Sequence, residues 1–185
     1  NEILNGDIHT TNQRLAELES RDQAKTFIYA LLYGAGDAKL GSVVGRGRAV
    51  GKGLRQRFFD NLPAFKKLTD RVQREAKSGF IKALDGRKLT VRSEHAALNT
   101  LLQGAGAIVM KKALIILDDK ITKHGWDAKF VANVHDEWQI ECHVDDAVSV
   151  VKAGVHAIRE AGCMFNLNCP LDGAYKVGEN WSETH

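Results

Sequence analysis

A long predicted helix followed by a short predicted hairpin is the feature that most limits how this chain can fold. Residues 94–123 predict one helix, and two short apolar segments, 130–134 and 138–142, then flank the polar residues 135–137. Strands joined by so few residues pair antiparallel, because a parallel pair needs a crossover of about a dozen residues or more. The pattern predicts an α+β fold rather than alternating βαβ units.

The rest of the chain adds shorter helices and another hairpin. A turn at 6–7 precedes a short helix to about residue 19, which Thr10 or Thr11 could cap. Ser20 precedes a helix over 21–32, whose apolar residues fall at helical spacing. The other predicted elements are helices over about 51–61, 63–77 and 144–161, a hairpin over 80–92 around Asp85-Gly86, and one strand within 166–185.

Charge is divided unevenly along the chain. Residues 1–133 carry 23 Lys and Arg against 14 Asp and Glu, whereas residues 134–185 carry 3 against 9. A basic half beside an acidic one suits a polyanion on one side and metal-binding or solvated carboxylates on the other. A solvated lysine-rich face is the alternative interpretation.

The composition limits the class of protein. With 44% hydrophobic residues, 26% charged residues and two prolines, the chain is typical of a folded globular protein. It shows no secretory signal pattern and no uninterrupted apolar run near the roughly 20 residues that span a bilayer. We therefore expect an intracellular protein without a membrane partner. We also expect its three cysteines to be reduced and mostly buried: Cys142, Cys163 and Cys169.

Four residues at steps of four form the first candidate site: Arg21, Lys25, Tyr29 and Tyr33. Each step of four rotates an α-helix by only about 40°, so the side chains form one stripe. Two cations followed by two aromatic rings suit a nucleotide, with charges for the phosphates and rings for the base and sugar. An ordinary amphipathic helix with tyrosines at the rim of a core is the alternative.

The second candidate site is His135-Asp136-Glu137, between the two apolar segments that follow the long helix. Adjacent carboxylates lifted out of an apolar sheet repel each other unless a cation or water serves them. Oxygen ligands suit Mg²⁺, which binds through one or two carboxylates together with waters and phosphates. Two alternatives are a plain polar β-turn and a metal phosphohydrolase, for which the other histidines give no convincing ligand set.

A third group of polar residues lies at steps of four on the long helix: His95, Asn99 and Gln103. Amide side chains on a helix face, with small residues beyond them, could contact base edges or sugars. Ordinary solvated polar residues are the alternative.

In this order the segments resemble the motifs of family A DNA polymerases. Residues 21–34 are similar to motif B, the helix of the fingers that closes on the incoming nucleotide. Residues 134–137 are similar to motif C of the palm, and residues 95–104 to the palm helix that touches the minor groove of the primer-template. Residues 5–10 resemble the stretch just upstream of motif B, and the likeness is closest to the phage replicative branch.

The resemblance implies roles in nucleotide binding. Arg21, Lys25 and His9 would hold the triphosphate, and Lys25 would also act in catalysis. Tyr29 would stack near the sugar, where tyrosine rather than phenylalanine implies weaker exclusion of nucleotides that lack a 3′-hydroxyl. Tyr33 would lie against the position of the template base.

The resemblance also implies roles in DNA and metal binding. Asp136 would bind the catalytic metals, and Glu137 would support that site in catalysis. His185 matches a terminal histidine of the phage branch, without a firm role. Contacts to the minor groove near the primer end would come from His95, Asn99, Gln103 and His135.

Two departures from the family pattern matter. Ala30 stands where many relatives have glycine, which is expected to tighten packing near the template base. Motif A is absent, and its aspartate would lie upstream of Asn1. The implied arrangement is fingers over 1–78 with the motif B helix at about 21–33, and a palm portion over 79–185 with the minor-groove helix at about 94–123 and the motif C hairpin at about 130–142.

The implied activity is nucleotidyl transfer from dNTPs to a primer 3′-hydroxyl on primer-template DNA, with two Mg²⁺ ions. Asp136 alone cannot hold both ions. We therefore expect the chain to be inactive unless an amino-terminal polymerase portion, on the same or a separate polypeptide, supplies the motif A aspartate. A phage-encoded protein would act in the cytoplasm of a bacterial host. A polymerase-derived module that binds nucleic acid or nucleotide without chemistry is the alternative, although Lys25 and Asp136 favour a catalytic origin.

Overall fold

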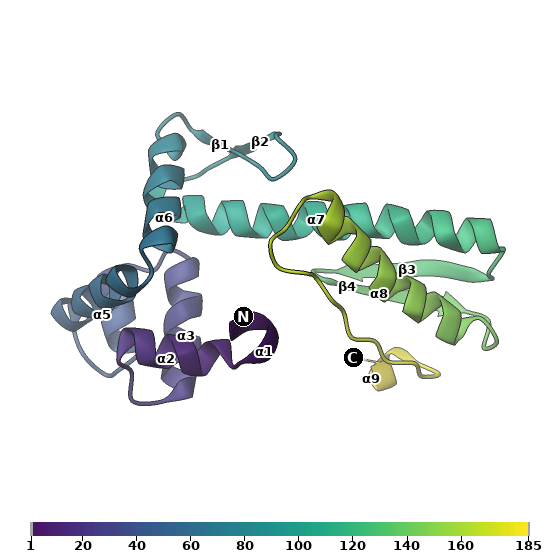
Figure 1. Cartoon of the computed structure of the whole chain (residues 1–185), viewed down its shortest axis with the longest axis horizontal. Helices are drawn as coiled ribbons and strands as arrows, with labels where there is room; N and C mark the ends of the chain where they lie inside the picture. The colour runs from purple at the N-terminus through teal and green to yellow at the C-terminus, as the bar shows by residue number, and fades with distance from the viewer. Residues whose placement is uncertain (1, 185) are drawn as a thin grey trace. The chain divides into compact units, whose positions relative to one another are not determined.

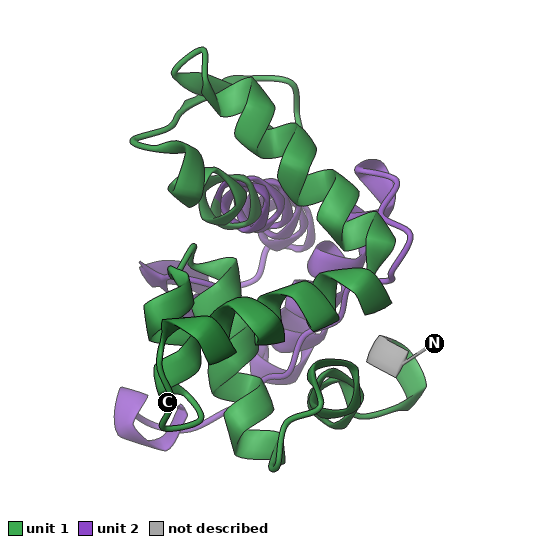
Figure 2. Ribbon diagram, turned by 90° about the vertical axis from the view of Figure 1, so that its left-hand side faces the viewer, with its two compact units in different colours: residues 1–103 green, residues 104–185 purple. Residues whose placement is uncertain are grey.

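The computed structural model describes residues 2–184, with side chains from Leu4 onward. The chain forms two compact units, Asn1–Gln103 and Gly104–His185, which Figure 2 colours separately. Helices and two antiparallel two-stranded sheets make up these units, which confirms the predicted α+β class. His185 lies outside the described residues.

The first unit is built around aromatic side chains of α3 and α5. Phe27 and Phe58 are buried, and their rings meet edge to face with centroids 5.7 Å apart. Leu40 and Leu54 belong to the same core. The helices of this part are α1 (Glu2–Asn5), α2 (Ile8–Ala16), α3 (Arg21–Leu32), α4 (Asp37–Ser42), α5 (Arg48–Asn61) and α6 (Pro63–Ala76), of which Figure 1 labels all but α4.

A short hairpin and the start of a long helix complete the first unit. β1 (Phe80–Lys82) pairs antiparallel with β2 (Lys88–Thr90). Ile81 of β1 is buried with Val72 of α6 in a second core cluster. The 3-10 turn η1 (Glu94–Ala96) then leads directly into α7 (Ala97–His124), which matches the predicted long helix.

The second unit combines most of α7 with a hairpin and α8 (Ala147–Met164). β3 (Ala128–Val134) pairs antiparallel with β4 (Glu137–Cys142), with a bulge between Phe130 and Ala132. An ion pair between Lys120 Nζ and Glu160 Oε2, 3.1 Å apart, joins α7 to α8. The boundary between the two units falls within α7, after Gln103. The predicted division into fingers and palm after residue 78 concerns function and stays a prediction.

The predicted cap of the short helix after residues 6–7, which is α2, is wrong. Asp7, rather than Thr10 or Thr11, caps α2, because its carboxylate accepts the hydrogen bond of the His9 backbone amide at 2.9 Å. Thr10 lies inside the first turn and donates its own hydroxyl hydrogen to Asp7. The helix also ends earlier than predicted, because Glu17 adopts the left-handed conformation with φ of 54°.

The tail and the cysteines also differ from the predictions. The described part of the tail contains no strand, and the Leu171 side chain packs against Gly162 of α8. Its last element is the short helix α9 (Trp181–Thr184). The three cysteines are free but not mostly buried, since Cys163 is exposed and the other two are half-buried.

One apolar helix bears on the expectation of no membrane partner. Among the described residues, Glu94–His124 is long and apolar enough to cross a bilayer by length and composition. A core helix of a soluble protein satisfies the same criterion, so this finding is weak evidence. The absence of a membrane partner stays a prediction.

Candidate functional site

The stripe predicted on α3 lies on the exposed face of that helix. Ala24, Phe27 and Leu31 are buried on one face of α3. The stripe occupies the opposite face. Tyr29 and Tyr33 expose 47% and 59% of their surface, so neither ring is buried in the core. The stripe residues are all exposed: Arg21, Lys25, Tyr29 and Tyr33.

An acidic residue that sequence reasoning missed links the start of α2 to the start of α3. Asp7 Oδ2 accepts hydrogen bonds from Arg21 Nε at 2.6 Å and from Thr10 Oγ1 at 2.9 Å. These donors, Arg21 above all, hold the pKa of Asp7 far below its ordinary value. The available signal was an aspartate directly before a helical segment, a preferred N-cap. Asp7 ties Arg21 to the element that carries His9.

Replacing Asp7 by asparagine is expected to change how stability depends on pH. A carboxyl whose pKa falls on folding stabilises the protein above its ordinary pKa, and this contribution is lost as the pH falls through the lowered folded value. The stability advantage of the wild-type chain over Asp7→Asn should therefore shrink on acidification below about pH 4. The change should be small because both partners are exposed. Urea unfolding at pH 7 and pH 3 measures it, and an advantage equal at both pH values would contradict it.

His9 lies beside the stripe on α3. The ring centroids of His9 and Tyr29 are 6.3 Å apart, with the rings tilted by 46°. Within the part of the chain that the structure describes, the buried His9 Nδ1 has no hydrogen-bond partner. A buried ring nitrogen without a partner is costly unless a ligand or water completes it. The structure therefore brings together three of the predicted nucleotide contacts, His9, Tyr29 and, through Asp7, Arg21.

The end of α3 meets the start of α7. Gln103 Nε2 donates a hydrogen bond to Tyr33 Oη at 3.3 Å. Beside this contact, a Cβ added to Gly34 would come within 2.3 Å of the His95 carbonyl oxygen. A hollow of about 80 Å³ at this junction is lined in part by Leu31, Gly34 and His95. The predicted template-base tyrosine and two predicted minor-groove residues thus belong to one local structure.

Gly34→Ala is expected to destabilise the first unit. Gly34 has a φ of 77°, and an added Cβ would also collide with backbone that cannot rotate away. The left-handed conformation alone costs an L-residue about 1–2 kcal/mol, so the free energy of unfolding should fall by about 2 kcal/mol or more. Gly53→Ala is the matched control, because Gly53 lies inside α5 with open space around it and should gain about 0.5–1 kcal/mol. Urea denaturation of both variants measures the difference, and equal stabilities would contradict the prediction.

The second unit presents the predicted metal carboxylate at the tip of a hairpin. Val134 pairs with Glu137, so His135 and Asp136 form a two-residue turn. His135 adopts a φ of 55°, as tight hairpin turns require of at least one residue. His135 and Asp136 are exposed, and Glu137 is half-buried. The tip therefore offers the Asp136 carboxylate to an external partner.

The donor chemistry at this tip fits part of a magnesium site. Among the side chains that the structure describes, residues 4–184, no group of three or more His, Cys, Asp or Glu could hold a metal ion by itself. Asp136 can serve as one ligand of a Mg²⁺ ion whose other ligands are waters, phosphates and a further carboxylate.

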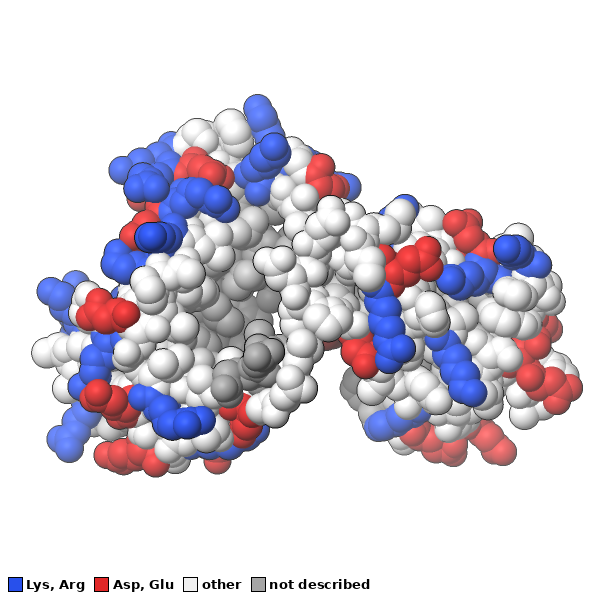
Figure 3. Space-filling view, in the orientation of Figure 1, with Lys and Arg blue, Asp and Glu red and all other residues white. Residues whose placement is uncertain are grey.

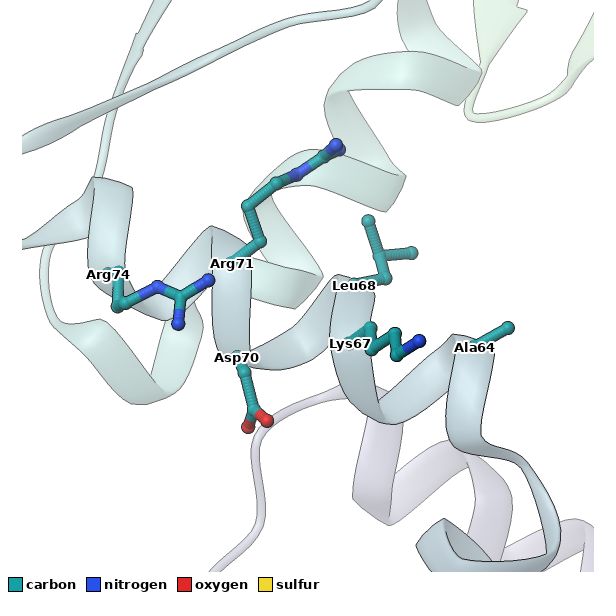
Figure 4. A pocket seen from close by; sticks show the side chains of 6 residues that line it. All are labelled: Ala64, Lys67, Leu68, Asp70, Arg71 and Arg74. Carbon is teal, nitrogen blue, oxygen red and sulfur yellow. The ribbon is translucent and has the colours of Figure 1, made fainter.

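Basic side chains gather on the surface of the first unit. Figure 3 shows Lys and Arg over α5 and α6. A hollow of about 480 Å³ along α6 contains no predicted site residue. In Figure 4 its cations, Lys67, Arg71 and Arg74, point in different directions rather than toward one point. This area is a basic surface suited to a polyanion rather than a pocket built for one ligand.

Comparison with protein families and curated proteins gives one consistent result. Residues 4–183 match the model of DNA polymerase family A. The DNA-directed DNA polymerases of Enterobacteria phage T3 and Escherichia phage T7 are each 47% identical over 206 residues, which cover 100% of this chain and 29% of theirs. DNA polymerase I of Aquifex aeolicus is 34% identical over 174 residues, covering 89% of this chain and 30% of its own. The chain spans less than a third of the length of these relatives.

A solved structure shares the fold. The POL domain of Pol1 from M. smegmatis, in a complex with DNA primer-template and dNTP, matches with a TM-score of 0.76 at 22% sequence identity. The match covers 85% of this chain and 32% of that one. At this identity the likeness concerns the fold alone.

Proposed function

Because the chain belongs to DNA polymerase family A, we propose that it supplies fingers and palm elements of a template-directed DNA polymerase. The enzyme would transfer dNTPs to the 3′-hydroxyl of a primer on primer-template DNA. The observation that carries the proposal is the exposed stripe of α3, with two cations toward its start and two tyrosines toward its end. The complex of the M. smegmatis domain contains a DNA primer-template and a dNTP, the two partners that this proposal requires.

The start of α3 is the proposed site for the triphosphate. Arg21, Lys25 and His9 would bind its oxygens, with Arg21 released from Asp7 or shared with it. Lys25 would stabilise the negative charge that grows on the pyrophosphate group as the bond to the α-phosphorus breaks. Tyr29 would pack against the sugar, and its position beside His9 supports a single site for sugar and phosphate.

The junction of α3 and α7 is the proposed site for the templating base and the nascent base pair. Tyr33 would lie at the template position, where its hydrogen bond to Gln103 holds the ring. His95, Asn99 and Gln103 would contact the minor groove from one face of the helical segment, and His135 would do so from the hairpin tip. Contacts to minor-groove acceptors report on pair geometry more than on sequence, because these acceptors are similar for A·T and T·A pairs.

Asp136 is the proposed metal carboxylate, with Glu137 in support. Two Mg²⁺ ions in a complete site would lower the pKa of the primer 3′-hydroxyl and neutralise the triphosphate. Asp136 is one ligand, so this chain would need the motif A aspartate of an amino-terminal polymerase portion. We propose that the chain alone is inactive, and that the assembled enzyme works in the cytoplasm of a bacterial host without a membrane partner.

Nucleotide binding by the chain alone tests the first half of this proposal. Isothermal titration with Mg²⁺ should show tighter binding of a dNTP than of the matching dNMP, because Arg21, Lys25 and His9 would contact the β- and γ-phosphates. We expect a difference of about tenfold or more, equivalent to one charge-assisted hydrogen bond. Equal affinities for dNTP and dNMP would refute a triphosphate site on α3.

A further inference from the structure

Hydrogen bonds link the hairpin that carries Asp136 to the end of the described chain. Gln139 Nε2 donates a hydrogen bond to Glu137 Oε1. On the other side, Thr184 Oγ1 lies 3.1 Å from Gln139 Oε1. Gln139 and Thr184 are 45 residues apart in sequence, so this is a tertiary contact. The three residues form one chain of hydrogen bonds from α9 to the carboxylate next to Asp136.

Strand geometry explains why Glu137 and Gln139 meet. Alternate residues of a strand point to the same face, so both side chains lie on one side of β4. Trp138 points to the other side, where its ring meets that of Phe130 edge to face. Because Trp138 and Phe130 anchor the apolar face, the opposite face places Glu137 and Gln139 side by side. Both are half-buried, which limits competition from water.

The chemistry of the three groups allows one orientation of the Gln139 amide. An ionised carboxylate can only accept hydrogen bonds, so the NH₂ group of Gln139 must face Glu137. The amide oxygen then faces Thr184, whose hydroxyl can donate to it. The Trp181 carbonyl, 3.2 Å from the same hydroxyl, is a further acceptor for it. Thr184 therefore favours the amide orientation in which Gln139 donates to Glu137.

The helix that carries Thr184 is joined by hydrogen bonds to the residues just before it. Glu183 Oε2 accepts the backbone N–H of Glu179 at 2.9 Å, and Glu183 Oε1 accepts a hydrogen bond from Asn180 Nδ2 at 2.8 Å. Gly178 lies so close that an added Cβ would come within 2.7 Å of Glu183 Cβ. These contacts hold α9 as a defined turn, so Thr184 reaches β4 from an ordered segment.

We infer that Gln139 and Thr184 are positioning residues for the metal site, which hold the Glu137 carboxylate in one orientation beside Asp136. This inference rests on the proposed function, because it gives Glu137 a role next to a metal-binding aspartate. A carboxylate held by Gln139 presents its oxygens to the metal site in a fixed direction. It also loses less conformational freedom when the metal binds, and outer partners of this kind typically change metal affinity by about 10–100-fold.

Binding of Mn²⁺ to the whole chain tests the inference without requiring DNA synthesis. The free Mn²⁺ signal in electron paramagnetic resonance gives the dissociation constant for the wild type and for Gln139→Leu, Thr184→Val and Thr184→Ser. We expect Gln139→Leu to weaken Asp136-dependent binding by about tenfold. Thr184→Val should weaken binding by about threefold, since it acts through Gln139, and Thr184→Ser should restore it because serine keeps the hydroxyl.

The controls separate the inference from the function on which it rests. Urea unfolding of each variant should match the wild type, so that a change in affinity reflects positioning rather than folding. Asp136-dependent Mn²⁺ binding that is equal in all four proteins would overturn the inference and leave the proposed function intact. Wild-type binding that does not respond to Asp136→Ala would overturn the metal role of Asp136, and the inference with it.

Discussion

Asp136→Ala is expected to abolish primer extension by the complete polymerase site. Asp136 stands at the exposed tip of the β3–β4 hairpin, and we propose that it binds the metal ions that activate the primer hydroxyl. Metal ions of this kind contribute several kcal/mol to transition-state stabilisation, so the rate should fall by about a thousandfold or more. Single-turnover incorporation of one dNTP, with this chain and the upstream portion together, measures the loss.

The matched control for this variant is Asp119→Ala. Asp119 is an exposed carboxylate of α7, so its removal changes the charge of the second unit by the same amount. It should leave the rate within about twofold, since isolated surface charges contribute little. Equal rates for Asp136→Ala and wild type would remove Asp136 from the catalytic site, while equal losses in both variants would point to a general charge effect.

Lys25→Ala is expected to have the second-largest effect. Lys25 is exposed in the middle of the α3 stripe, where we propose that its ammonium group stabilises charge on the departing pyrophosphate. Removing one such donor from a transition state lowers kcat by about 10²–10³-fold in other enzymes, so kcat/KM for dNTP should fall by about 100-fold or more. The affinity for dNTP in the absence of turnover should fall less, by about tenfold.

Lys39→Ala controls for the loss of a cation from the same region. Lys39 is exposed on α4, a different helix from the one that carries the stripe. Its kcat/KM should stay close to that of the wild type, apart from a weak effect on nonspecific attraction of DNA. For Lys25→Ala, the contradicting result is a loss in kcat/KM no greater than the loss in dNTP affinity. That result would show that Lys25 acts only in binding.

Local patterns predicted much of the fold. The helix over 21–32 was predictable because its buried residues recur at helical spacing after a serine cap, and Ser20 does accept the hydrogen bond of Gln23. The hairpin at 135–137 was predictable because short apolar segments flank polar residues. The six-residue helix α4 was not predicted, since a helix that short depends on tertiary contacts rather than on its own sequence.

The site was predictable only where its residues share one element. The spacing of Arg21, Lys25, Tyr29 and Tyr33 fixes their common face by helix geometry alone. The partners of these residues were not predictable, because Asp7 reaches Arg21 and Gln103 reaches Tyr33 across different elements. Neither contact leaves a periodic signal in the sequence. The link from Thr184 to Gln139 has the same character, since it joins the chain's last described turn to the middle of a strand.

Primer extension by reconstitution tests the central claim most directly. The chain, a polypeptide with the upstream motif A region, and their mixture would each be given primed template, Mg²⁺ and dNTPs. We predict synthesis only in the mixture, with addition only of the dNTP complementary to the template, and loss of synthesis with Asp136→Ala. Synthesis by the chain alone would contradict the proposed need for motif A. No synthesis in any reaction, with DNA binding intact, would contradict the catalytic role and favour a binding module.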